Sequence, residues 1–271
     1  MHSVSPLTFI RSAWRNRHLI GQMVRREVGG RYRGSVLGLL WSFLNPLFML
    51  VIYTFVFSVV FQARWGEGSS GSRTEFAMIL FSGLIVFNLF AEVVNRSPTL
   101  ILGHPNLVKK VVFPLEVLPV VAAGSALFHA LVSLGVLLGV RLLLDQEFSP
   151  TVVFLPLLLL PLLLVTLGVS WFLASIGVFL RDTSQTIGIV TTAMLFLSPV
   201  FFPVSALPEA FRAVQFLNPL AFPVEESRNL LIWGKMPQWS GMALYLLFSV
   251  LVAWCGLFWF QRTRKGFADV L

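Results

Sequence analysis

Long runs of uncharged, mostly apolar residues fill most of the chain, and shorter segments between them hold most of the charges. A helix needs about 20 such residues to cross a bilayer. Six runs approach or exceed this length, at residues 36–61, 76–95, 115–140, 151–180, 186–203 and 242–260. The pattern predicts an all-α polytopic membrane protein with six transmembrane helices. Pro156 and Pro161 interrupt the fourth run, which we interpret as one helix with an interfacial lead-in.

Positive charge is divided unequally between the two sides of the predicted membrane domain. With both termini inside, 14 of the 20 Lys and Arg residues lie in inside segments. The other six lie outside, and they are Arg64, Arg73, Arg141, Arg212, Arg228 and Lys235. Because Lys and Arg favour the cytoplasmic side, we expect cytoplasmic N- and C-termini. The chain then divides into a cytoplasmic segment (1–35), a membrane domain (36–261) and a cytoplasmic tail (262–271).

Two segments outside the six runs have helical patterns of their own. Within residues 7–28, apolar side chains recur on one face and arginines on the others, and Gly29-Gly30 predicts the end of the helix. We expect an amphipathic N-terminal helix, or two, in the cytoplasmic headgroup region near anionic lipid. The N-terminal helix could only anchor the topology of the chain, or it could move during function, and the pattern fits both interpretations equally well.

Between residues 204 and 241, two proline-led stretches predict two short helices before the last span. They begin near Pro208 and Pro223 and end before Gly234. Each stretch is too short to span but apolar enough to dip into the bilayer. We expect re-entrant or interfacial helices at the outer face.

Composition narrows the class of protein and the chemistry. Hydrophobic residues make up 56% of the chain and charged residues 12%, against about 25% charged in soluble proteins. The net charge of +8 therefore follows from topology, and we expect no nucleic-acid partner. There is no phosphate-binding loop for ATP, and the four histidines are too scattered for a metal site. We predict no catalytic residue and no metal ligand.

A few ionisable residues lie within or near the spans. Glu92 and Glu116 fall near cytoplasmic ends, where we expect pairing roles, with Arg96 in the favourable i+4 position for Glu92. His129 falls in the middle of the third run. A polar residue there is a functional candidate, but a helix–helix hydrogen bond is the favoured interpretation.

Aromatic residues recur along the first span. Trp41, Phe48 and Phe55 lie seven residues apart on one face, with Phe43 and Phe57 roughly opposite. Such a face could stack against sugar rings, or it could pack against lipid or protein.

The loop between the second and third spans contains a short apolar and basic helix that Asn106 could cap and Pro114 would end. That helix could receive force from a soluble partner, or it could be a plain linker.

Three motifs carry a resemblance to a known family. The first is 25–27 (Arg-Arg-Glu) with 31–38 (Arg-Tyr-Arg-Gly-Ser-Val-Leu-Gly) and 41–47 (Trp-Ser-Phe-Leu-Asn-Pro-Leu). The second is 106–110 (Asn-Leu-Val-Lys-Lys) with 113–119 (Phe-Pro-Leu-Glu-Val-Leu-Pro), and the third is 180–183 (Leu-Arg-Asp-Thr). At these residues the chain resembles the permease subunit of type-2 ABC exporters for bacterial polysaccharides such as O-antigen, capsule and teichoic acid.

The resemblance implies a homodimer that pairs with a separate dimeric ATPase and moves a lipid-linked glycan across the inner membrane. ATP and Mg²⁺ would bind the ATPase, with no cofactor in this chain. The coupling residues would be Asn106, Leu107, Val108, Lys109 and Lys110. The interfacial and gating residues would be Arg25, Arg26, Glu27, Arg31, Tyr32 and Arg33.

The resemblance also implies a glycan channel lined by the first and fifth spans. Its candidate lining residues are Trp41, Phe48, Tyr53, Phe55, Phe196, Phe201 and Phe202. The outer helices would form a gate with Phe211, Phe216, Glu225 and Glu226.

Three other functions compete with polysaccharide export. A drug or lipid exporter permease would share the topology but would not account for the Arg-Tyr-Arg-Gly-Ser junction. An intramembrane glycosyl or lipid transferase would act without an ATPase. A proton-coupled transporter predicts internal repeats and acids at mid-depth, and the sequence has neither.

Overall fold

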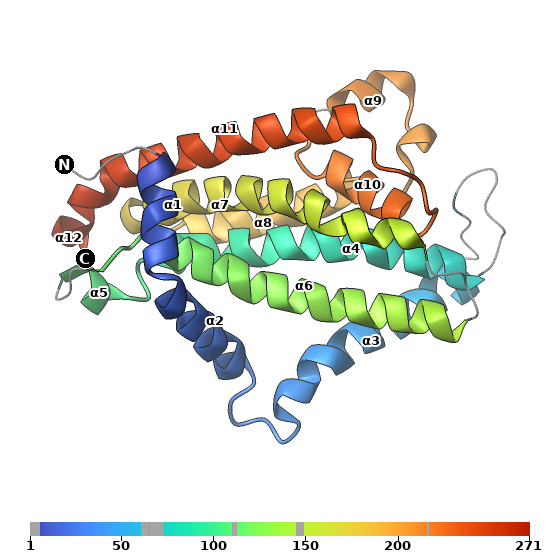
Figure 1. Cartoon of the computed structure of the whole chain (residues 1–271), viewed down its shortest axis with the longest axis horizontal. Helices are drawn as coiled ribbons and strands as arrows, with labels where there is room; N and C mark the ends of the chain where they lie inside the picture. Colours follow the sequence, from blue (N-terminus) through green and yellow to red (C-terminus); the bar gives the residue numbers. More distant parts are fainter. Residues whose placement is uncertain (1–5, 61–64, 66–72, 110–112, 145–148, 216) are drawn as a thin grey trace.

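The computed structural model describes residues 6–60, 65, 73–109, 113–144, 149–215 and 217–271. Every regular element in these residues is helical, which confirms the predicted fold class. The longer helices run side by side along the longest axis of the molecule (Figure 1). The α-helices are α1 (Pro6–Arg15), α2 (Arg17–Arg31), α3 (Trp41–Tyr53), α4 (Arg73–Arg96), α5 (Pro105–Lys109), α6 (Val117–Leu143), α7 (Leu155–Phe179), α8 (Thr183–Leu197), α9 (Glu209–Gln215), α10 (Ala221–Leu231), α11 (Trp239–Thr263) and α12 (Phe267–Val270).

Five helical stretches in the described residues are long and apolar enough to cross a membrane. They are Gly38–Phe57, Thr74–Thr99, Val117–Leu143, Pro150–Phe179 and Trp239–Val270. The predicted fifth span corresponds to α8, which has 15 residues, fewer than the roughly 20 that a span needs. Ser198 is extended because it precedes Pro199, so the helix ends there. The total of six spans stays a prediction.

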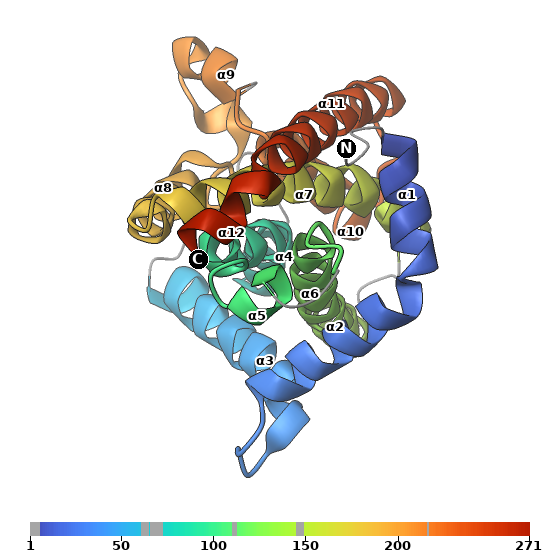
Figure 2. The same cartoon turned by 90° about the vertical axis from the view of Figure 1, so that its left-hand side faces the viewer.

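Helix α4 lies inside the bundle and α3 lies at its edge (Figure 2). In the most apolar window of α4, 89% of the residues are buried, against 6% in that of α3. Helices α3, α6, α7, α8 and α10 all contact α4. A helix that is apolar on every side belongs in the interior, and α4 fits this description apart from a few polar positions.

The two ends of the bundle differ in what they carry. Both chain termini lie at one end with α1, α5 and α12, which we call the terminal end; α9 and α10 lie at the opposite end (Figure 1). At the terminal end, the indole N–H of Trp171 in α7 donates to the carbonyl of Glu116 at 3.0 Å. Phe9 of α1 packs edge-on against the same indole, 4.9 Å between ring centroids. The N-terminal helices are therefore part of the folded bundle.

The N-terminal segment forms two helices, but the prediction that Gly29-Gly30 ends the second was wrong. Helix α2 continues to Arg31, and the chain turns only where Gly34 and Gly38 have positive φ, 86° and 50°. Two glycines cost a helix about 1 kcal/mol each. Tertiary packing outweighs this cost, because α2 lies against α6, with Val24 over Gly124.

Helix α10 is held inside the protein by a fully buried arginine. The Arg228 side chain donates to the carbonyls of Ile79 (3.3 Å) and Val200 (2.7 Å), and its guanidinium lies 4.3 Å from the Trp65 ring centroid. Both short helices exist as predicted, although α10 begins at Ala221, ahead of Pro223. Their re-entrant or interfacial placement stays a prediction.

Glycine lets α7 and α11 approach until their backbones touch. A Cβ on Gly256 would collide with the carbonyl of Gly168, and a Cβ on Gly168 would lie 2.6 Å from the carbonyl carbon of Val252. Small residues at such crossings are the usual means by which membrane helices pack closely. The crossing joins the last long helix to the rest of the bundle.

We predict that Gly168→Ala destabilises the protein by about 1–3 kcal/mol, because the added methyl group forces α7 and α11 apart. Thermal unfolding in mild detergent measures the change. Gly139→Ala in α6 is the matched control, since a Cβ there has nothing within 4 Å. Equal melting temperatures for the two variants would contradict the prediction.

Candidate functional site

Two ion pairs join the N-terminal helix α2 to the central helix α4. Glu27 lies 2.6 Å from Arg96, and Arg31 lies 2.9 Å from Glu92. The predicted i,i+4 pair of Glu92 with Arg96 is therefore wrong, because each of these residues takes its partner from α2 instead. The other predicted junction arginines, Arg25, Arg26 and Arg33, are exposed.

His129 of α6 joins the second ion pair. Its Nδ1 lies 3.1 Å from Glu92 Oε1 and 2.9 Å from Arg31 Nη1. A protonated Nδ1 donates to the carboxylate and an unprotonated one accepts from the guanidinium, so the tautomer decides which contact is a hydrogen bond. The favoured helix–helix role of His129 is thus present, with Glu92 as its partner. We call Arg31, Glu92 and His129 the charged cluster.

Tyr32 follows Arg31 in the chain and packs against His129 of the charged cluster. Its ring lies edge-on to the His129 imidazole, with 6.1 Å between centroids. Burial raises the pKa of the Tyr32 hydroxyl above its ordinary value. The hydroxyl therefore stays a neutral hydrogen-bonding group over the physiological pH range.

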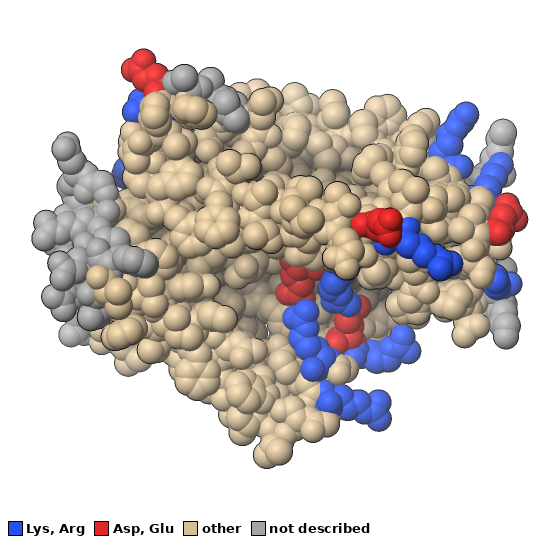
Figure 3. Space-filling model, turned by 180° about the vertical axis from the view of Figure 1, so that it is seen from behind, with Lys and Arg blue, Asp and Glu red and all other residues tan. Residues whose placement is uncertain are grey.

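A cavity of about 490 Å³ opens beside the charged cluster, between α3, α4 and α6. In Figure 3, acidic and basic side chains gather around a hollow near the middle of the surface, and further charges lie toward the two ends. The residues that line the cavity are Arg31, Tyr32, Ser42, Asn45, Pro46, Met49, Tyr53, Phe81, Ile85, Asn88, Leu89, Ala91, Glu92, Asn95, Ala126, His129, Ala130 and Ser133. The charged cluster and several uncharged polar side chains from three helices therefore line one cavity.

Sequence reasoning did not identify the three asparagines of this cavity, Asn45, Asn88 and Asn95. Each is a single uncharged polar residue in an apolar run, which resembles a packing position. The signal that could have found them is that Asn88, Glu92 and Asn95 lie three or four residues apart and so share one helix face. Which other helices meet that face is a matter of tertiary structure.

The predicted coupling segment forms α5 at the terminal end. Asn106 and Lys109 are exposed, while Leu107 and Val108 pack against the apolar cluster that includes Phe267. The helix begins at Pro105, so Asn106 is not its cap. Lys110 lies outside the described residues.

The C-terminal segment holds the loop that carries α5. Arg264 pairs with Glu116 at 2.8 Å and donates to the Phe113 carbonyl at 2.7 Å. Phe267 is fully buried and packs edge-on against Phe260, 5.5 Å between centroids. The pairing role expected for Glu116 is therefore present.

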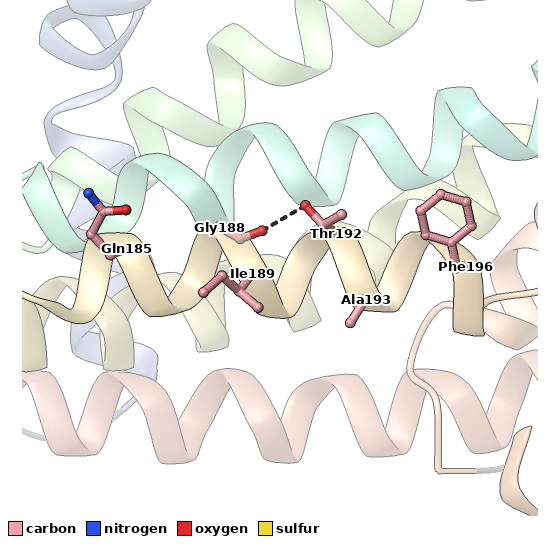
Figure 4. Close-up of a pocket in the computed structure, with 6 residues that line it drawn as sticks. All are labelled: Gln185, Gly188, Ile189, Thr192, Ala193 and Phe196. Carbon is pink, nitrogen blue, oxygen red and sulfur yellow. Dashed lines mark hydrogen bonds between the residues drawn. The ribbon is translucent and has the colours of Figure 1, made fainter.

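Some of the predicted channel aromatics lie on open faces of α3 and α8. Phe48, Phe55 and Phe196 are 52%, 59% and 64% exposed. Figure 4 shows one face of α8, where Gln185, Gly188, Ile189, Thr192, Ala193 and Phe196 line a shallow groove of about 510 Å³.

The other predicted channel residues are partly covered. Trp41 and Phe202 are half-buried, and Tyr53 lines the polar cavity. Phe201 stacks on Phe196 with 5.6 Å between ring centroids, and Phe57 stacks on Phe201 at 6.1 Å. Phe57 packs toward the core, on Phe76 at 5.7 Å between ring centroids, while Phe48 and Phe55 are exposed. Its predicted position roughly opposite them on the first span is therefore confirmed.

The predicted gate residues at the opposite end have different environments. Phe211 is 62% exposed, and Phe216 lies outside the described residues. Glu225 is half-buried and accepts a hydrogen bond from the Val204 backbone N–H at 3.4 Å. Glu226 is 2% exposed and accepts from the Gln238 backbone N–H at 2.8 Å, so it fixes the connection between α10 and α11.

Comparison with known proteins gives matches over nearly the whole chain. The chain is 28% identical over 265 residues to the O-antigen export system permease protein RfbA of Myxococcus xanthus. The matched region covers 97% of this chain and 99% of the relative. It is 26% identical to the polysialic acid transport protein KpsM of Escherichia coli, over 89% of this chain and 91% of the relative. The capsule polysaccharide export inner-membrane protein CtrC of Neisseria meningitidis is 20% identical over 98% of both chains.

The family model for ABC-2 type transporters matches residues 18–232, well over half of the chain. The matched part runs from α2 through α10 and so includes both ion pairs, the polar cavity and α5. The chain belongs to the ABC-2 type transporter family.

Proposed function

We propose that the chain is the permease subunit of an ABC exporter that moves a lipid-linked polysaccharide across the bacterial inner membrane. The polysaccharide would be of the O-antigen, capsule or teichoic-acid type. The observation that carries the proposal is the nearly full-length match to permeases named for O-antigen and capsule export, in several bacterial species. Membrane-length apolar helices support a transport role.

The transport path in this proposal lies between two copies of the chain. The first apolar stretch is 6% buried in its most apolar window, and α8 leaves Ile189 and Phe196 exposed, so both helices have faces that a second copy could cover. Aromatic side chains on those faces suit the apolar faces of sugar rings while placing no fixed charge in the path. The candidate lining residues are those predicted from the sequence.

Energy would come from a separate dimeric ATPase that binds ATP and Mg²⁺. Helix α5 suits contact with such a partner, because it offers Asn106 and Lys109 to solvent while Leu107 and Val108 fix it to the bundle. Motion of α5 would reach the spans through the loop that Arg264 holds. The terminal end would face the cytoplasm, in accord with the distribution of Lys and Arg. Helices α9 and α10 would then lie at the outer face as the gate.

We predict that deleting the gene from the source bacterium abolishes its surface polysaccharide, and that a tagged chain retrieves a nucleotide-binding subunit in mild detergent. Immunoblots of surface glycan and mass spectrometry of the purified complex measure the two results. Re-expression of the intact chain is the control and should restore the glycan. Normal surface glycan in the deletion strain would overturn the proposed function.

We predict that Lys109→Glu lowers export and substrate-stimulated ATPase activity severalfold at unchanged permease level, because it reverses an exposed charge at the proposed contact. Lys265→Glu is the matched control, because Lys265 is also an exposed cation at the same end. Unchanged ATPase coupling in the Lys109 variant would argue against a partner contact at α5.

We predict that replacing Trp41, Phe48 and Phe55 together with Ala impairs glycan export severalfold more than it lowers expression, because a stacking surface is lost. Surface glycan normalised to permease level measures this. Phe43→Ala on the same helix is the control, with 45% of its side chain exposed. A parallel fall of export and expression would indicate that these aromatics serve packing alone.

A further inference from the structure

Three polar side chains in the cavity between α3, α4 and α6 have no hydrogen-bond partner among the described residues. They are Asn45 of α3, Tyr53 at the end of the same helix, and Asn88 of α4. Two other cavity side chains do have hydrogen-bond partners. Ser133 donates to the His129 carbonyl at 2.9 Å, and Asn95 accepts from Thr191 at 2.8 Å.

The position of Asn88 is exceptional for its helix. From Phe76 to Ala91, every residue of α4 is buried except Asn88, which is exposed to the cavity it lines. An amide left unpaired in hydrocarbon costs several kcal/mol. Because Asn45 opens onto the same cavity, the cavity holds either water or a polar ligand in the folded protein.

The charges around the cavity cancel one another. Arg31 and Glu92 form one ion pair, and His129 contacts both. A phosphate or another anion would have to separate Arg31 from Glu92 and leave the partly buried Glu92 carboxylate without its cation. The cavity therefore favours an uncharged ligand.

The unpaired groups and the walls match one class of ligand. Amides and phenols both donate and accept hydrogen bonds, as sugar hydroxyls do. Pro46, Met49, Phe81 and Ile85 supply apolar walls that suit the C–H faces of a sugar ring. The cavity extends along α4 from Phe81 to Asn95, about 21 Å at the helical rise. Its volume of 490 Å³ lies within the range of about 300–1,000 Å³ typical of ligand sites.

We propose that this cavity binds uncharged pyranose units of the transported glycan, with Asn45, Asn88 and Tyr53 as the hydrogen-bonding groups. This inference rests on the proposed export function and places a saccharide site within one subunit. The charged cluster lines the site and keeps its net charge near zero.

The test uses two photoreactive probes on the full-length protein in lipid nanodiscs. One is a β-glucoside with a short alkyl diazirine tail, and the other is a phosphate monoester with the same tail. Mass spectrometry locates the labelled peptides. We expect the glucoside to label residues 41–53 and 81–95 preferentially, and the combined variant Asn45→Leu with Asn88→Leu to lose about tenfold of that labelling.

The controls separate a binding role from a folding role. Ser133→Ala alters the same cavity, but its hydroxyl is already satisfied within α6, so its labelling should equal that of the unaltered protein. If the combined variant does not fold, the single variants replace it, each with a loss of about threefold.

Three results would overturn the proposal. The first is unchanged glucoside labelling in the combined variant. The second is stronger labelling by the phosphate probe that Arg31→Gln abolishes, which would indicate a headgroup site. The third is no labelling of the cavity by either probe, which would indicate water alone. The export function is judged separately by the deletion strain, so loss of surface glycan without cavity labelling would reject only the saccharide site.

Discussion

A charged side chain among membrane-spanning helices needs a partner of opposite sign, and α4 obtains its partners from a helix outside the spans. Glu92 and Arg96 of α4 pair with Arg31 and Glu27 of α2, at 2.9 and 2.6 Å. All four side chains stay partly exposed, at 42% and 18% for Arg31 and Glu92, so each pair contributes less to stability than a fully buried one. The N-terminal helix is therefore held to the interior of the bundle as well as to the membrane surface. Its position and the position of α4 are linked by the same two interactions.

The central helix also contacts the parts of the protein farthest from α2. Asn95 of α4 accepts a hydrogen bond from Thr191 of α8, and the Ile79 carbonyl of α4 accepts one from the buried Arg228 of α10. Closely packed interiors transmit displacement with little loss. A shift of α4 driven from the terminal end would thus act on α8, which carries an open aromatic face, and on α10 at the opposite end. The polar cavity opens on this helix between those two regions.

At a few residues, the local sequence signal and the tertiary structure disagree. The helix-cap signal of Gly29-Gly30 failed because packing of α2 on α6 favours a continued helix. The local pair of Glu92 with Arg96 failed because a charge from another helix lies closer to each. In each case a contact between distant segments overrode a correct local preference.

The sequence by itself determined that the chain is an all-α membrane protein, because the cost of exposing backbone in lipid makes long apolar runs helical whatever their neighbours. It also determined the two short helices before the last span and the resemblance that family membership confirms. Only the tertiary structure decided which polar residues meet. Asn45 and Asn88 lie 43 positions apart in the chain, and Arg31 and His129 lie 98 apart. Their convergence on one cavity depends on helix packing, which no local pattern records.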